Sequence, residues 1–185
     1  IYRPRPGRPF TTVTLSNGER HDLWTTFTPS QIDIDLTTPT GHEYIEDILR
    51  TLSSHGVRMV RLDAVGYAIK KRGTSCFMIP ETFELIAELS RRARTRGMEV
   101  LVEIHSHYYR QIEIAKRVDW VYDFALPPLV LHALYTRSAG PLKKWLAVSP
   151  RNALTVLDTH DGIGVIDVGP NRNGRQGFLT SPDIE

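Results

Sequence analysis

The sequence predicts an α/β fold, part of a (β/α)8 barrel, from three observations. Short apolar segments alternate with longer stretches in which apolar residues recur at helical spacing, which is the pattern of parallel βαβ units. No glycine-rich phosphate loop follows any apolar segment, which disfavours a nucleotide-binding open sheet. Acidic residues and histidines follow these segments instead, as they do at the carboxyl ends of barrel strands. Because the four apolar segments are too few to close an eight-stranded barrel, we expect about half of one.

A hairpin is expected before the alternating region. Asn17 and Gly18 form a turn signal between two β-prone runs, residues 11–15 and 23–27. A proline-rich opening, residues 1–10, precedes these runs. The sequence therefore predicts a small antiparallel β unit ahead of the barrel part.

The alternating region begins near residue 41. Apolar residues at helical spacing between Tyr44 and Leu52 predict the first helix, which ends at the His55-Gly56 pair. A second amphipathic helix is expected from Pro80 to Gly97. The expected strands are residues 57–62, 99–104, 120–124 and 153–157, and further helices are expected over residues 109–118 and 127–148.

Composition excludes several classes of protein. The chain has 185 residues, of which 41% are hydrophobic and 24% charged, and these values are typical of a soluble globular protein. Its net charge of +2 gives no field that would attract nucleic acid or an anionic membrane. The apolar stretches are far shorter than the roughly 20 residues that cross a bilayer. One cysteine, Cys76, excludes an internal disulfide framework and favours a reducing cytoplasm.

The first candidate site residues end the strand expected over residues 57–62. Side chains alternate between the faces of a strand, so Arg61 and Asp63 point the same way. The cation favours the ionised carboxylate, as a nucleophile or an electrostatic stabiliser requires. A structural ion pair at a strand end is the alternative.

The second candidate group ends the strand expected over residues 99–104. Alternation would put Glu103, His105 and His107 on one face. Carboxylate and imidazole ligands suit Zn, Mn or Fe, so a metal site is one hypothesis. The other is that Glu103 is a general acid facing Asp63, with His105 binding substrate. In a purely structural role, His107 would lie in a solvated loop.

The third candidate group follows the strand expected over residues 153–157. Asp158, His160 and Asp161 gather acidic groups in an apolar context, and burying carboxylates is costly unless they are paired or catalytic. Asp161 precedes Gly162, so a turn-capping role is its alternative.

Together these groups predict sugar chemistry. Carboxylates at the carboxyl ends of three parallel strands, Asp63, Glu103 and Asp161, should meet at one mouth. Retaining glycosidases use a nucleophile and an acid/base carboxyl about 5–5.5 Å apart. A third carboxylate can bind sugar hydroxyls and assist ring distortion. We therefore expect transfer through a glycosyl-enzyme.

Several segments carry a family resemblance. Residues 61–67, 102–106 and 157–161 resemble, in order and context, three signature strands of the α-amylase superfamily. Within it, the chain is similar to the sucrose phosphorylase family over nearly its whole length, although the similarity thins after residue 167. The segments that carry this narrower resemblance are residues 1–7, 27–31, 73–78, 122–128 and 155–165.

The resemblance implies a reversible, α-retaining glucosyl transfer in which sucrose and phosphate give α-D-glucose 1-phosphate and D-fructose. Asp63 would be the nucleophile, Glu103 the general acid/base and Asp161 the transition-state stabiliser. No metal or organic cofactor is implied. The residues implied to bind substrate are Arg5, Phe27, Gln31, Arg61, Tyr67, His105 and His160.

Arg5 would reach the phosphate or fructose position. A guanidinium offers a planar fork to phosphate oxygens, which a water acceptor would not need. Phosphate must approach three carboxylates, so a cation on the acceptor side would offset the repulsion. The prolines around Arg5 restrict the backbone that carries it.

The resemblance also implies an organisation. Residues 1–40 would be the end of a small inserted domain, residues 41–162 barrel strands four to seven, and residues 163–185 the start of a second inserted loop region. We expect the chain to be a piece of a cytoplasmic protein that forms a homodimer at full length and has no nucleic acid or membrane partner.

Other functions remain open at this point. The same chemistry with another acceptor would give a hydrolase, or a phosphorylase of glucosylglycerol, glucosylglycerate or sucrose phosphate. A metal-dependent barrel hydrolase would use Glu103, His105 and His107. A non-catalytic carbohydrate-binding fragment is the third alternative, because a half-barrel exposes its sheet edges. Expressed alone, the chain would then be poorly soluble or bind no sucrose.

Overall fold

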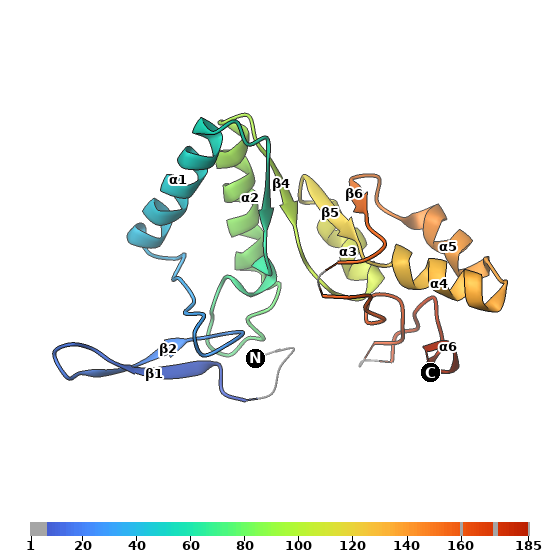
Figure 1. Cartoon of the computed structure of the whole chain (residues 1–185), viewed down its shortest axis with the longest axis horizontal. Coiled ribbons are helices and arrows are strands. Elements are labelled where there is room, and N and C mark those ends of the chain that lie inside the picture. Colours follow the sequence, from blue (N-terminus) through green and yellow to red (C-terminus); the bar gives the residue numbers. More distant parts are fainter. Residues whose placement is uncertain (1–6, 160, 172–173, 185) are drawn as a thin grey trace.

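The computed structural model describes residues 7–159, 161–171 and 174–184. Two sheets lie apart from each other: a two-stranded antiparallel one and a four-stranded parallel one with helices beside it (Figure 1). This is the expected partial barrel with a small β unit. Among the described residues, no helix combines the length and the apolar character that a membrane crossing needs.

The predicted hairpin consists of β1 (Phe10–Thr14) and β2 (Arg20–Trp24). The strands pair from Phe10 opposite Trp24 to Thr14 opposite Arg20. Gly18 has a φ of 86° and so provides the left-handed turn residue, as its position after Asn17 predicts. The second strand begins three residues earlier than expected, because cross-strand pairing extends over polar residues of low strand propensity.

The parallel sheet has the order β3-β4-β5-β6, so strands adjacent in sequence are neighbours in space. Its strands are β3 (Met59–Leu62), β4 (Glu99–Val102), β5 (Trp120–Asp123) and β6 (Ala153–Thr155). Each lies within a segment predicted to be a strand. In the described chain β3 and β6 each pair on one side, which leaves the sheet open at both edges as in part of a barrel.

Helices precede, connect and follow these strands. The Thr38 hydroxyl caps the first helix by accepting from the amide of Gly41 at 3.1 Å, and Pro39 is its first residue. The helices are α1 (Pro39–Ser54), α2 (Pro80–Arg94), α3 (Tyr108–Ala115), α4 (Leu126–Thr136), α5 (Gly140–Val148) and the short α6 (Ser181–Ile184), with a 3₁₀ turn η1 (Val65–Tyr67).

Residues 127–148 are mostly helical, as predicted, but they are divided between two helices. The structure has two helices, α4 and α5, because the backbone at Arg137 enters the left-handed region with a φ of 57° and ends α4. Pro141 then lies in the first turn of α5, where its missing N–H costs nothing. The polar run from Thr136 to Ser138 and the Gly140-Pro141 pair mark this break in the sequence.

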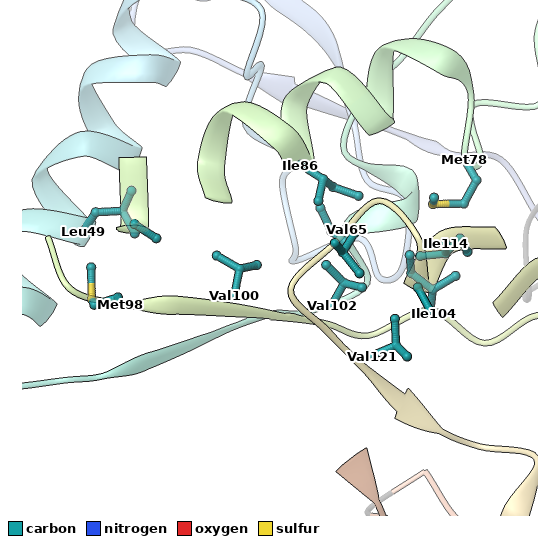
Figure 2. Packing of buried hydrophobic residues seen from close by; sticks show 13 residues of the cluster. Leu49, Val65, Met78, Ile86, Met98, Val100, Val102, Ile104, Ile114 and Val121 are labelled. Atoms are coloured by element: carbon teal, nitrogen blue, oxygen red, sulfur yellow. The ribbon is translucent and has the colours of Figure 1, made fainter. Parts of the chain in front are cut away.

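The main core lies between the sheet and the helices on one side of it. Figure 2 shows Ile86 from α2, Ile114 from α3 and Val121 from β5 converging there, with Val100 and Val102 of β4. Alternate positions of β4 thus point to this layer. A second cluster forms where α4 and α5 meet the C-terminal segment, around Leu129, Trp145, Val168 and Leu179.

A buried carboxylate joins this second cluster to the sheet. Asp123, the last residue of β5, is 4% exposed, and burial raises its pKa. Both its oxygens accept from the Trp145 indole N–H, at 3.0 and 3.1 Å, and the amide of Leu126 donates to Oδ1 at 3.0 Å. Asp123 therefore fixes the start of α4 and the position of α5 relative to β5.

Replacing Asp123 by Ala should lower the free energy of unfolding by about 3 kcal/mol, because it leaves two buried N–H donors without an acceptor. Chemical denaturation of the variant measures the loss. The matched control is Asp47→Ala, which removes an exposed carboxylate paired with Arg50 and should cost at most about 0.5 kcal/mol. Equal, small losses in both variants would contradict this role of Asp123.

Candidate active site

A pocket of about 360 Å³ lies at the carboxyl ends of β3 and β4. Seven residues predicted from the sequence line it together: Phe27, Gln31, Asp63, Tyr67, Glu103, His105 and Asp161. Arg5 and His160 lie outside the described residues. A hollow of about 500 Å³ between α1 and the open side of β3 is lined mostly by apolar side chains, so its chemistry suits packing better than catalysis.

Arg61 holds the two central carboxylates. The register pairs Leu62 with Val102, so Asp63 and Glu103 leave adjacent strands at the same level. The Arg61 guanidinium lies 2.6 Å from Asp63 Oδ1 and 2.7 Å from Glu103 Oε2. The hydrogen bond to Glu103 raises the pKa of Arg61. A cation between two acidic groups therefore offsets their repulsion.

The two carboxylates have different surroundings. The Asp63 side chain is 71% exposed, whereas that of Glu103 is 8% exposed. The amide of Ala64 donates to Glu103 Oε2 at 3.3 Å, and Ala64 itself has a left-handed φ of 45°. An unusual backbone conformation directly after Asp63 thus directs an N–H at its neighbour. One carboxylate is open to solvent and the other is enclosed.

Glu103, His105 and Asp161 form a tight group. Each offers an atom, and these atoms all lie within 4.8 Å of one another, so the three residues could hold a divalent ion. The metal set considered as one hypothesis, Glu103, His105 and His107, does not come together among the described residues. The reason is that β4 ends at Val102, so the alternation that would align Glu103, His105 and His107 stops there.

His107 is not solvated either. It precedes α3, is 5% exposed, and its ring contacts those of Tyr108 and Tyr109 at 4.6 and 5.1 Å between centroids. Burial lowers the pKa of His107. This residue belongs to the packing beneath the pocket.

Aromatic rings form one wall of the pocket. Phe27 meets Tyr67 edge to face at 5.4 Å, and Tyr67 meets Phe77 at 4.8 Å between centroids. A side chain at Gly66 would come within 2.8 Å of the Phe77 ring, so glycine permits this close packing. Sequence reasoning missed Phe77 as a lining residue, although it lies in a segment that carries the family resemblance. Gln31 accepts from the Thr28 hydroxyl at 2.9 Å beside this wall.

The expectation of buried acids around residue 160 is wrong. Asp158 and Asp161 are both exposed. The buried carboxylate of this segment is Asp167, which is 0% exposed and which sequence reasoning missed. Its only signal in the sequence is an acidic residue between apolar neighbours, Ile166 and Val168.

Comparison with known proteins identifies the family of this chain. No family model matches. The chain is 60% identical over 185 residues to the sucrose phosphorylase of Agrobacterium vitis and 50% identical over 187 residues to that of Bifidobacterium adolescentis, and both alignments include the whole chain. The chain belongs to the sucrose phosphorylase family. It spans 38% and 37% of the length of these two relatives.

Other proteins similar to this chain carry different names. The glucosylglycerol phosphorylase of Marinobacter adhaerens is 44% identical over 169 residues, 91% of this chain and 35% of that protein. The crystal structure of sucrose 6F-phosphate phosphorylase from Thermoanaerobacter thermosaccharolyticum superposes with a TM-score of 0.88 at 36% identity, covering 99% of this chain and 37% of that one. A trehalulose synthase, with a TM-score of 0.61 at 16% identity over 84% of this chain and 32% of that one, shares the fold.

Replacing Arg61 by Met should lower the free energy of unfolding by about 3 kcal/mol, because the enclosed Glu103 carboxylate loses its cation. In the double variant with Glu103→Gln most of this stability should return, since the unpaired charge is gone. Denaturation of the single and double variants measures the coupling.

The control for that cycle is Arg50→Met, which removes an exposed ion pair with Asp47 and should change stability by at most about 0.5 kcal/mol. Additive losses for Arg61→Met and Glu103→Gln would show that the guanidinium does not compensate the buried charge.

Proposed function

We propose that this chain supplies the catalytic centre of a longer enzyme that transfers glucosyl groups reversibly with retention of the α configuration. The reaction is sucrose plus phosphate to α-D-glucose 1-phosphate plus D-fructose. The observation that carries this proposal is the Arg61 guanidinium between Asp63 and Glu103 at the mouth of one pocket. The share of its relatives that the chain spans supports a longer protein.

Asp63 is the proposed nucleophile. Its carboxylate is exposed to the pocket, and the adjacent guanidinium lies 2.6 Å from Oδ1, which leaves the carboxylate oriented for attack on an anomeric carbon. Attack gives a covalent glucosyl-enzyme and releases fructose. A phosphate oxygen then attacks the same carbon from the face that fructose left, opposite Asp63, and displaces the Asp63 carboxylate, so the two inversions give net retention.

Glu103 is the proposed general acid and base. Its enclosed position beside Asp63 lets it donate a proton to the departing fructose oxygen and later accept one from the incoming phosphate. Asp161 lines the same pocket within 4.8 Å of Glu103 and is the proposed transition-state stabiliser. Double displacement itself calls for no metal or organic cofactor.

Substrate binding is proposed for the remaining pocket residues. Phe27 and Tyr67 present ring faces and edges of the kind on which sugar rings pack, with Gln31 and His105 as polar partners. Arg61, Arg5 and His160 complete the proposed set. For Arg5 the support is the chemistry of a guanidinium toward phosphate.

Assembly, location and domain limits also stay proposals. The single cysteine favours a cytoplasmic protein, and we keep the homodimer and the division at residues 40 and 162 as predictions. The hairpin ending at Trp24 and the helix starting at Pro39 agree with a change of unit near residue 40.

One observation favours a second candidate function, a phosphorylase of the same mechanism that acts on another substrate. The similarity to a glucosylglycerol phosphorylase and to sucrose 6F-phosphate phosphorylases shows that relatives with different named substrates share this segment.

Sucrose cleavage that requires inorganic phosphate and exceeds cleavage of glucosylglycerol supports the proposal. Phosphate-independent cleavage indicates a hydrolase, and activity lost to a chelator and restored by Zn or Mn indicates the metal-dependent alternative.

Asp63→Asn in the full-length protein should lower the rate of phosphate-dependent sucrose cleavage by about a thousandfold or more, because an amide cannot form the glucosyl ester. Release of glucose 1-phosphate measures the rate. The control is Asp47→Asn, an exposed carboxylate on α1 that should leave the rate unchanged. Sucrose cleavage by Asp63→Asn at the rate of the unsubstituted enzyme would refute the assignment of Asp63 as nucleophile.

A further inference from the structure

We propose that Asp167 is a positioning residue that orients His105 in the pocket. This inference rests on the proposed function, since it assigns a second layer to the same site. Asp167 follows Asp161 by six residues, is buried beside His105 and has none of the roles given above.

Asp167 anchors the backbone beside His105. Its Oδ1 accepts from the amide of Ser106 at 3.1 Å and from the side-chain amide of Gln111. Its backbone carbonyl accepts from the amide of Tyr108 at 2.8 Å. Gln111 in turn donates to the Ser106 carbonyl at 3.0 Å. One buried residue therefore determines the path of the chain between β4 and α3.

The second carboxylate oxygen faces the imidazole. Asp167 Oδ2 lies 3.6 Å from His105 Nδ1, and it accepts no hydrogen bond from the part of the chain that the structure describes. The His105 ring also stacks on Phe124, with 3.8 Å between centroids and 20° between planes. A carboxylate at the edge of the ring and an aromatic ring on its face restrict the rotation of His105.

Burial of the Asp167 carboxylate would destabilise the fold if the residue served packing alone. Asp167 is fully buried, and burial raises its pKa. A buried carboxylate with one unpaired oxygen destabilises a fold unless a neighbour uses its charge. Asp167 Oδ2 lies 3.6 Å from His105 Nδ1 and is the acceptor that a proton on this ring nitrogen faces.

The consequence concerns substrate. A ring held with a proton at Nδ1 has a defined donor and a defined orientation toward Glu103 and Asp161, with which it shares the pocket. Partners of this kind behind a functional histidine commonly affect activity by ten- to a hundredfold. Asp167 therefore acts on sugar binding through His105 and touches no substrate itself.

A double-mutant cycle in the full-length enzyme tests the proposal. Asp167→Asn keeps an oxygen for Ser106 and Gln111 but removes the charge, and it should lower kcat/KM for sucrose about ten- to a hundredfold. In a His105→Gln background the same substitution should change kcat/KM by less than about twofold, because its target is gone. Asp183→Asn, an exposed acid whose partners are Thr180 and His132, should leave kcat/KM unchanged.

A loss from Asp167→Asn that persists undiminished without His105 would overturn the proposal, because a purely structural role acts in both backgrounds. So would an unaltered kcat/KM in the single variant. If the unmodified enzyme shows no glucosyl transfer, the proposed function fails instead.

A second measurement needs no change at Asp167, so it holds even if that variant does not fold. Nitrogen NMR of the histidine-labelled enzyme, with the His105 signal assigned by its loss in His105→Gln, should show a proton on Nδ1. A neutral ring protonated only at Nε2 would contradict the positioning role.

Discussion

The Arg61 guanidinium lies between two carboxylates that neighbouring parallel strands bring to one edge of the sheet. Asp63 and Glu103 leave β3 and β4 directly after the paired residues Leu62 and Val102. Two acidic groups at such close range repel each other unless a cation compensates them. Without the contacts of 2.6 and 2.7 Å that Arg61 makes, the enclosed carboxylate would be an unpaired buried charge. The pocket depends on this interaction.

The rest of the structure holds that edge in place. The apolar layer of α2, α3, β4 and β5 fixes the strands, and it leaves their carboxyl ends free for polar side chains (Figure 2). Asp123 and Asp167 also each use a buried carboxylate to join two segments that are distant in the sequence. Asp123 binds Trp145 of α5, and Asp167 binds the loop after β4. Aspartate therefore stabilises the fold at the end of β5, as Asp123, and has a proposed catalytic role after β3, as Asp63.

Much of the fold could be predicted from the sequence, because it depends on local patterns. The alternation of apolar segments and helical periodicity gives the order of the elements, and Asn17-Gly18 gives the hairpin. The Gly140-Pro141 pair marks a break between α4 and α5, but the position where α4 ends is not marked, since the left-handed residue Arg137 is neither glycine nor asparagine. The strand predicted over residues 99–104 extends past the observed end of β4, because apolar residues such as Ile104 continue beyond the last paired residue.

Strand periodicity predicted the site residues at strand ends, whereas the loop residues that line the pocket were predicted through the family resemblance. Asp63 and Glu103 follow strands, so periodicity placed them. Asp161 follows a strand end by several residues, and its exposure could not be read from apolar neighbours. Asp167 contacts residues about sixty positions earlier in the chain, and such contacts between loops leave no periodic signal. Phe77 reaches the pocket because Gly66 allows close approach, which is a property of packing.

In the proposed mechanism Asp63 forms a covalent bond to glucose while Glu103 assists departure of the leaving group. The most direct test uses the full-length Glu103→Gln variant with α-D-glucosyl fluoride, whose leaving group needs no proton. Mass spectrometry of the quenched and digested protein should find one hexosyl unit attached to Asp63. Hexosyl attached to another residue, or rapid turnover with no attachment at Asp63, would contradict the account.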